Sequence, residues 1–285
     1  MKLVVGYVPE HFSTPLFLAL QHGFYAKHNV DVEFKPFPSG SGHLIQCLGD
    51  KTINVSVGLT EAFIRGIAAG NESYKLVGVY VQSPLCWAVS TGSKRDIRSV
   101  DELEGSTVGV SRMGSGSDVM AKVLQLQKGW TTPFKYEINN DFKNLRDGVN
   151  HVGAAHPTDF FMWEHFTSKK YYDSGEIKRV GEIYTPWPSW VISASPDVDS
   201  GSLKAFVDAV NEGIAYFRSH PDEAISYITS NLDYSEEDAR NWLKTVKFSD
   251  DCAAISNELV QSTLDILKPA AGLPEGVEKL EYIKK

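Results

Sequence analysis

The sequence predicts an α/β protein of two lobes, and three observations support this fold class. The chain has 285 residues, and two lobes are favoured because a single core stops growing at roughly 250–300 residues. Strand and helix patterns alternate in two successive series, Leu3–Gln82 and Trp87–Ser195. From Ser202 onward only helical patterns follow, and a helical block without strands of its own has to cover a sheet.

The first series begins with a predicted strand over Leu3–Val8, which ends at Pro9 because proline cannot continue a ladder. Thr14 and Pro15 then open a helix that Gly23 ends, in the order expected of a cap, a first-turn proline and a terminal glycine. The remaining elements are strands over Val30–Phe34, Ile53–Val57 and Lys75–Gln82, and helices over about His43–Leu48 and from Thr60 to Gly70. This alternation favours a mainly parallel sheet with helices on both faces.

The second series has the same plan. Its predicted strands are Trp87–Ser90, Thr107–Val110, Phe134–Ile138, Val152–Ala155, Ile177–Ile183 and Trp190–Ser195. Its predicted helices are a short one after Ser99, then Asp118–Lys128, Asp141–Val149 and Thr158–Phe166, the last containing the apolar run Phe160–Trp163. The C-terminal helices are Leu203–Arg218, one opened by Pro221, one capped by Ser235 with Asp238 at the capping-box position, and Asn257–Lys268.

A discontinuous first lobe is the economical topology for this order of elements. Residues 1–85 and 196–285 are expected to form lobe one, and residues 86–195 lobe two. The chain would then cross between the lobes twice, near Ser83–Trp87 and near Ile192–Pro196.

Composition narrows the class of partner to small molecules. The net charge is −8 with no basic run, so the electrostatic footprint of a protein that binds nucleic acid or anionic membranes is absent. The three cysteines are an odd number at long spacings, which predicts neither a disulfide framework nor a zinc site. No His-Glu-x-x-His pattern or cofactor signature occurs, so no metal and no cofactor is predicted.

The sequence also predicts a cytoplasmic location without insertion into a membrane. The apolar stretch before Gly6 and Pro9 is shorter than the 7–15-residue core of a secretory signal. No segment approaches the ~20 apolar residues of a membrane span. A leader absent from the sequence as given would instead place the protein in the periplasm or outside the cell.

Ligands of open α/β sheets sit outside the carboxyl ends of the strands, at helix N-termini. Six loops are therefore candidates: Pro9–Thr14, Pro38–Gly42, Gly58–Glu61, Ser111–Ser117, His156–Asp159 and the aromatic stretch Tyr184–Trp190. Two of them, Ser39-Gly40-Ser41-Gly42 and Gly114-Ser115-Gly116-Ser117, place small residues before a helix, where N–H groups and the helix dipole meet an acceptor or anion. Tight turns with serine caps are the alternative explanation of both, and neither is a nucleotide-binding signature.

Eighteen residues of these loops are predicted to bind the ligand, and none is predicted to be catalytic. They are Glu10, His11, Phe12, Ser39, Gly40, Ser41, Gly42, Thr60, Glu61, Arg112, Met113, Gly114, Ser115, Gly116, Ser117, Asp159, Trp187 and Trp190. Each has a structural alternative: a hydrogen-bonded loop histidine for His11, a helix-dipole role for Glu61, and packing between lobes for the tryptophans. Glu10, Glu61, Asp118 and Asp159 outnumber Arg112, which favours a ligand with amine or amidine donors, although a helix N-terminus can still accept one acidic group.

Several stretches resemble the type II periplasmic-binding-protein superfamily. They are Gly6-Tyr7-Val8-Pro9, Leu16-Phe17-Leu18-Ala19-Leu20, Gly23-Phe24-Tyr25, Val30-Asp31-Val32, the Ser39–Gly42 loop, the positions Asp101, Leu103, Gly105 and Val108-Gly109-Val110 leading to Ser111, and Phe160-Phe161-Met162-Trp163-Glu164. The nearer resemblance is to the branch of nitrate, sulfonate and taurine solute-binding proteins and binders of thiamine-pyrimidine precursors, and it covers most of the chain.

The resemblance implies a two-lobed, hinged protein that clamps a planar amine-bearing heterocycle or a small organic anion without catalysis. It leaves room for a membrane permease as a partner, although no residue supports one. A ligand-sensing module is one alternative. Another is an enzyme similar to the fungal synthase of the thiamine pyrimidine, with His11, Glu61 or Asp159 as acid or base, but the cysteine-rich iron motif of that enzyme is missing here.

Overall fold

The computed structural model describes residues 2–284 and divides into two compact units. The first unit contains residues 2–83, 187–263 and 275–284, and the second contains residues 84–186 and 264–274. The chain passes from the first unit to the second after Ser83, within the range Ser83–Trp87 expected for that crossing. It returns to the first unit between Pro186 and Trp187 rather than near Ile192. Residues 187–195 thus group with the first unit, and residues 264–274 with the second.

The first unit is built on a five-stranded sheet of order β2-β1-β3-β10-β4. Its strands are β1 (Lys2–Tyr7), β2 (Asp31–Pro36), β3 (Val55–Leu59), β4 (Lys75–Val81) and β10 (Trp190–Ala194). β1 pairs parallel with β2 and β3, whereas β10 runs antiparallel to both β3 and β4. The four strands other than β10 therefore share one direction.

β10 corrects the sequence analysis, which placed Trp190–Ser195 in the second series. It lies instead between β3 and β4 in the first sheet. All five of its residues are buried, so the strand carries no alternation of polar and apolar residues, and a run of this kind does not reveal which sheet it joins.

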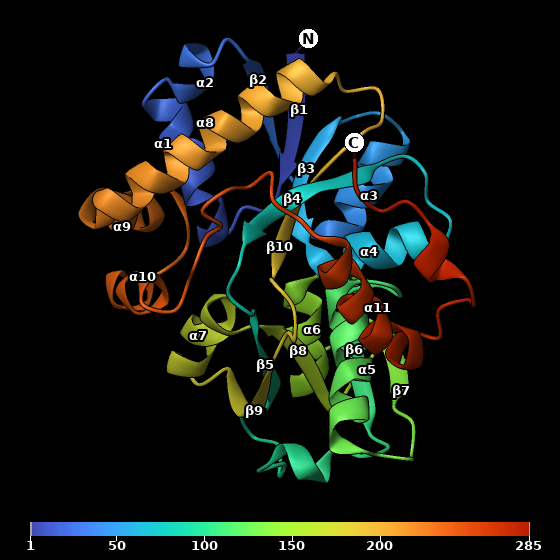
Figure 1. Cartoon of the computed structure of the whole chain (residues 1–285). Helices are drawn as coiled ribbons and strands as arrows, with labels where there is room; N and C mark the ends of the chain where they lie inside the picture. Colours follow the sequence, from blue (N-terminus) through green and yellow to red (C-terminus); the bar gives the residue numbers. More distant parts are fainter. Residues whose placement is uncertain (1, 285) are drawn as a thin grey trace. The chain divides into compact units, whose positions relative to one another are not determined.

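Helices cover both faces of the first sheet. They are α1 (Thr14–Gln21), α2 (Phe24–Lys27), α3 (Ser41–Gly49), α4 (Thr60–Ala68), α8 (Ser200–Ser219), α9 (Pro221–Asn231) and α10 (Glu236–Leu243), together with the short 3-10 helix η1 (His11–Ser13). Figure 1 shows α8 lying along α1 and α2, which it contacts. Gly213 permits this close approach, because a Cβ at that position would lie 2.5 Å from the carbonyl oxygen of Pro15.

The outer edge of β4 is covered by C-terminal segments of the same unit. The Leu76 N–H donates to Tyr282, and the Val79 N–H donates to Ala254. The isolated pairs Leu76 with Ile283 and Val81 with Phe248 extend this cover. The edge strand is thus protected from pairing with other chains.

The second unit contains a sheet of order β7-β6-β8-β5-β9. Its elements are β5 (Cys86–Gly92), η2 (Val100–Glu102), β6 (Thr107–Val110), α5 (Gly116–Lys128), β7 (Lys135–Ile138), α6 (Phe142–Asn150), β8 (Phe160–Glu164), α7 (His165–Asp173) and β9 (Ile177–Tyr184). The helix α11 (Asn257–Ala271) and the short η3 (Val277–Lys279) complete the chain. No helix among residues 2–284 has the length and apolarity that a membrane crossing requires.

Two predicted elements of the second unit are wrong. Val152–Ala155 is a turn region rather than a strand, and Thr158–Phe166 is not a helix, because its apolar run forms the central strand β8 and α7 starts only at His165. Phe160, Phe161 and Met162 are completely buried. A strand covered on both faces reads as a continuous apolar run, which periodicity alone cannot tell from a buried helix.

Candidate functional site

The carboxyl edge of the first sheet brings together most of the loops predicted for that unit. β1, β2, β3 and β4 run in the same direction, so the loops that follow Tyr7, Pro36, Leu59 and Val81 leave the sheet at one edge. The antiparallel β10 begins at that edge with Trp190. The loops Pro9–Thr14, Pro38–Gly42 and Gly58–Glu61 and the segment 187–189 therefore meet there.

Two of these loops are joined by the side chain of Ser41. Gly40 precedes α3 with φ +77°, a left-handed conformation that favours glycine. Ser41, the first residue of α3, accepts the N–H of Leu59 at 2.8 Å through its hydroxyl. Gly58 allows this contact, because a Cβ there would lie 3.0 Å from the Ser41 hydroxyl and 2.4 Å from the Phe63 ring. Ser39 and Gly42 are half-buried beside them.

Glu61 is the buried acid of this edge. It lies in the first turn of α4 and has no exposed surface. The indole N–H of Trp187 donates to its Oε2 at 2.9 Å, and its Oε1 has no hydrogen-bond partner among residues 2–284. Loss of hydration on burial raises the pKa of Glu61 to about 7. Thr60, one residue earlier, fixes the start of α4 by donating its N–H to Ser189 at 3.1 Å.

The side chains of His11 and Phe12, in the loop after β1, are buried in the protein. The His11 ring stacks on Tyr234 and Trp242, with centroids 4.4 Å and 4.2 Å away. Burial lowers the pKa of His11 well below its usual range, so the ring is neutral and part of the aromatic core. Phe12 and Trp190 are also buried, with ring centroids 5.2 Å apart. Contact of these three residues with a ligand stays a prediction, and their burial argues against it.

In the second unit, several polar groups of the loop after β6 and the first turn of α5 bind one another. Asp118 is completely buried in the first turn of α5, and its Oδ2 accepts the N–H of Gly114 at 2.8 Å. The Lys122 ammonium lies 2.9 Å from the same carboxylate. The Ser117 hydroxyl accepts the N–H of Ser111 at 3.1 Å and contacts the Ser115 hydroxyl at 2.9 Å.

The other predicted residues of this loop differ in exposure. Gly116 begins α5 and is buried, Arg112 is half-buried, and Met113 is exposed by 52%. A methionine with this exposure is the one apolar contact surface that the loop offers.

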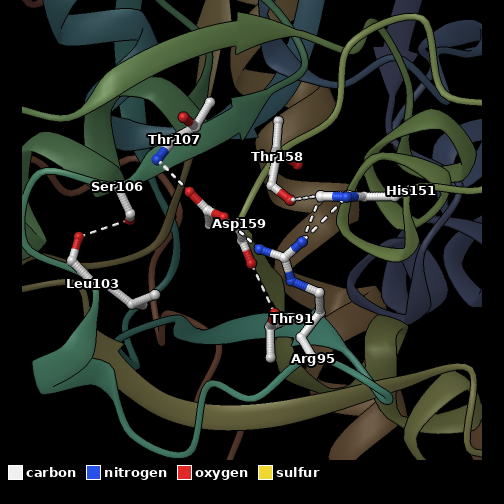
Figure 2. A network of polar contacts seen from close by, with 8 residues as sticks. All are labelled: Thr91, Arg95, Leu103, Ser106, Thr107, His151, Thr158 and Asp159. Atoms are coloured by element: carbon white, nitrogen blue, oxygen red, sulfur yellow. Dashed lines mark hydrogen bonds and ion pairs between the residues drawn. The ribbon is translucent and has the colours of Figure 1, made fainter.

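Asp159 lies at the opposite edge of the second sheet, so its predicted place after a strand is wrong, while its contact with a ligand stays a prediction. It precedes β8, and its Oδ2 accepts the N–H of Thr107, the first residue of the parallel β6, at 2.9 Å. Arg95 donates to Oδ1 at 2.5 Å, and Thr91 donates to the Asp159 carbonyl at 2.7 Å. Figure 2 shows these contacts converging on Asp159. The wrong place of Asp159 follows from the wrong prediction of β8. A helix over Thr158–Phe166 would put Asp159 after the predicted strand Val152–Ala155, whereas in the structure Asp159 precedes the strand β8.

Replacing Asp159 with asparagine is expected to destabilise the fold by about 1–2 kcal/mol. The amide keeps the shape of the side chain but loses the charge that Arg95 and the Thr107 N–H bind, and hydrogen bonds to charged groups contribute roughly 1.5–3 kcal/mol. Urea unfolding of the two proteins measures the difference. A variant as stable as the wild type would contradict the structural role of this carboxylate.

Glu164 was not among the predicted site residues. It ends β8, so it lies at the carboxyl edge of the second sheet, as Ser111 does. The side chain is 5% exposed and accepts the N–H of Thr167 at 2.7 Å. Loss of hydration raises the pKa of Glu164 to about 7. A buried strand over Phe160–Glu164, had it been predicted, would have marked this carboxylate as the strand's last residue.

The structure offers little for metal or thiol chemistry. Among residues 2–284, no cluster of three or more His, Cys, Asp or Glu side chains is arranged to hold a metal ion. The three cysteines are free, and burial raises the pKa of both Cys86 and Cys252 to about 12. These two thiols are therefore protonated and weakly nucleophilic at neutral pH.

Comparison with known proteins gives a family and a fold. The model of the Ca3427-like PBP family matches residues 87–183. The solved structure of the Candida albicans CA3427 gene product, which is described as defining a new family with the generic periplasmic binding protein fold, is 46% identical over 100% of this chain and 98% of its own, with a TM-score of 0.94. A search of curated proteins gives no match.

More distant structures share the fold alone. The periplasmic aliphatic sulphonate binding protein SsuA of Escherichia coli is 16% identical, covers 99% of this chain and 97% of its own, and has a TM-score of 0.75. The ligand-binding component of an ABC-type import system from Staphylococcus aureus is 13% identical, covers 99% of both chains, and has a TM-score of 0.72. The predicted α/β fold of the periplasmic-binding-protein superfamily is thereby confirmed. The cytoplasmic location stays a prediction.

Identity of 46% over nearly the full length of both chains, together with the family match within the second unit, shows that this chain belongs to the Ca3427-like family of proteins with the periplasmic binding protein fold.

Proposed function

We propose that this protein is a solute-binding protein that holds one small molecule at the carboxyl edges of its two sheets without transforming it. The observation that carries the proposal is the carboxyl edge of the first sheet, where several loops surround a buried carboxylate with one oxygen that no described residue binds. Buried polar groups are normally hydrogen-bonded, so an oxygen left open where ligands of α/β sheets bind suggests a missing partner.

The chemistry of the remaining groups supports binding rather than catalysis. Two of the three residues considered as acid or base are committed elsewhere: His11 is a neutral ring within an aromatic stack, and Asp159 holds Arg95 and β6. Of the three, Glu61 alone remains near a candidate site. A single carboxylic acid without an activated nucleophile beside it is a weak basis for an enzyme.

Closure of the two units on the ligand is the proposed mechanism. The chain passes from one unit to the other twice, and hydrogen bonds join these two segments in each unit. Within the first unit, Ser189 donates to the Ser83 carbonyl. Within the second unit, Thr185 and Leu85 form hydrogen bonds with each other. Pro84 and Pro186 stand at the two crossings. Short, anchored connections of this kind suit a hinge, and a ligand shifts such an equilibrium by contacts that only the closed state completes.

Ligand binding is expected to raise the melting temperature and to shrink the molecule. A ligand bound only by the folded state at 100 times its Kd adds about 2.7 kcal/mol of stability. A thermal-shift screen with amines, amidines, aminopyrimidines and sulfonates identifies binders, and small-angle scattering then measures the radius of gyration with and without the binder. Mass spectrometry of the recovered ligand tests for turnover, which would favour the alternative of an enzyme similar to the thiamine-pyrimidine synthase.

Trp187→Phe is expected to weaken binding of such a ligand about 3- to 10-fold, because it removes the N–H that orients Glu61 while keeping an aromatic ring. The net contribution of a typical hydrogen bond, about 0.5–1.5 kcal/mol, sets this range. Trp130→Phe is the matched control, since Trp130 is a half-buried tryptophan that lies outside the candidate loops. Calorimetric titration of the three proteins measures the effect, and equal affinities would remove Trp187 from the site.

A further inference from the structure

The geometry points to Glu61 as the group that selects the ligand, and to a ligand that presents a cationic or N–H-donating nitrogen rather than a sulfonate or another anion. This inference rests on the proposed function and decides between the two ligand classes that the sequence leaves open. Two independent observations carry it, one in each unit.

The first observation is the half-satisfied carboxylate in the first unit. Trp187 binds Oε2 of Glu61 at 2.9 Å, while Oε1 has no partner among residues 2–284. An ionised carboxylate is an acceptor only, so the group that completes Glu61 in its ionised form has to be a donor. A protonated nitrogen fits best, because an ionised carboxylate inside the protein is strongly disfavoured unless a cation or several donors compensate it.

Glu61 has no ionic partner among residues 2–284. Loss of hydration raises the pKa of Glu61, whereas a backbone hydrogen bond and the Trp187 indole lower it. No charged side chain shifts this pKa. Arg65, one helical turn later on α4, forms no ion pair with it in the part of the chain described. The position is therefore electrostatically open to an incoming cation.

The second observation is the internal carboxylate in the loop after β6. This loop has the small residues and helix N-terminus that bind anions in other proteins. Here the carboxylate of Asp118 occupies that place, since it accepts the N–H of Gly114 at 2.8 Å and is neutralised by Lys122 at 2.9 Å. An anionic ligand group would therefore find the Gly114 donor already used by a completely buried carboxylate of the protein.

Access to Glu61 involves the segment that starts at Trp187. The carboxylate is closed off from solvent in this conformation. Trp187 is the first residue after the chain returns to the first unit, and it binds Glu61 directly. A movement of this segment would uncover the carboxylate and couple its exposure to the hinge.

The test compares two aromatic probes of similar size, benzamidine and benzenesulfonate, on the wild-type protein, on Glu61→Gln and on Glu237→Gln. The control residue Glu237 also lies in the first turn of a helix, α10, but is exposed. Isothermal titration at pH 8 is expected to show benzamidine binding to the wild type and to Glu237→Gln, with affinity 10- to 150-fold lower for Glu61→Gln, as loss of a hydrogen bond between charged groups predicts. Benzenesulfonate is expected not to bind.

The same titration at pH 6 adds a readout that a structural role would not produce. Benzamidine stays protonated at both pH values, whereas Glu61 takes up a proton, so the wild-type affinity is expected to fall about 10-fold and the residual affinity of Glu61→Gln to stay constant. Equal binding of benzamidine to the wild type and to Glu61→Gln would overturn the inference. Binding of benzenesulfonate alone would also overturn it while supporting the proposed function, and failure of both probes would count against both proposals.

Discussion

Replacing Glu61 with glutamine is expected to stabilise the ligand-free protein relative to the wild type at pH 8 by up to about 3 kcal/mol more than at pH 5. Burial raises the pKa of Glu61 from its ordinary value of 4.5 to about 7 in the folded state. Each unit of difference between the folded and unfolded pKa corresponds to about 1.4 kcal/mol. Glutamine has the same shape and no charge to bury, so it does not incur this loss.

The pH window follows from the direction of the shift. Because the folded state holds the Glu61 proton more tightly than the unfolded state, its contribution to stability is fully present below pH 4.5 and is lost as pH rises to about 7. By about pH 8 the carboxylate is largely ionised in both states, and above that pH the difference stays constant. Urea unfolding of both proteins at intervals from pH 5 to pH 8 measures the difference in the free energy of unfolding.

The comparison between proteins is needed because other buried groups titrate in the same range. Glu164 has a pKa of about 7 and the same sign, so its stability contribution is also lost between pH 4.5 and 7. His11 has the opposite sign, since its lowered pKa makes the folded state more stable as pH rises toward 6.5. Glu164→Gln is the matched control for a buried carboxylate of the second unit. A pH-independent difference between Glu61→Gln and the wild type would show that Glu61 does not take up a proton on folding in this range.

A gain of stability at pH 8 together with a loss of ligand affinity would separate function from structure at this position. Breaking a buried polar contact normally destabilises a protein. Replacing a residue that serves binding at the expense of stability has the opposite effect: the free protein becomes more stable and the ligand binds less tightly. This trade-off is common in binding sites. The same substitution thus reports on both properties of the Glu61 side chain.

Residues that begin and end helices and strands were enough to predict most elements of the first unit and its carboxyl edge. Pro9 follows closely after β1, Gly40 with its positive φ precedes α3, and Thr60 is the first residue of α4. Pro9 and Gly40 act through their own backbone geometry, which is visible in the sequence, whereas Thr60 forms no side-chain cap and is held by Ser189. The loops they define do meet at one edge of the sheet.

The errors concern properties that depend on distant contacts. β8 and β10 are buried strands without alternation, so the apolar run Phe160–Met162 was predicted as helix and β10 was assigned to the wrong sheet. Asp159 was therefore expected at the carboxyl edge of the second sheet, where Glu164, the last residue of β8, lies instead. The sequence also gives no sign that Asp118 closes its own loop, because an aspartate in the first turn of a helix is ordinary capping chemistry.

Trp242→Ala is expected to destabilise the protein by about 3–5 kcal/mol, the range for removing a large aromatic side chain from a core. Trp242 is 1% exposed and packs against the His11, Phe12 and Phe248 rings. It belongs to α10, whereas His11 and Phe12 belong to the loop after β1. The aromatic cluster therefore fastens the C-terminal helices to the edge of the first sheet that carries the candidate loops.

This prediction also decides the role of His11. If its ring is a core element, the double variant His11→Ala with Trp242→Ala should be less destabilised than the sum of the single variants by about 0.5–1.5 kcal/mol, the usual coupling of an aromatic pair. Thermal and urea unfolding of the four proteins measure the cycle, with Trp242→Phe as the conservative variant that retains part of the stack. Additive effects would mean that the 4.2 Å contact between the two rings contributes nothing to stability.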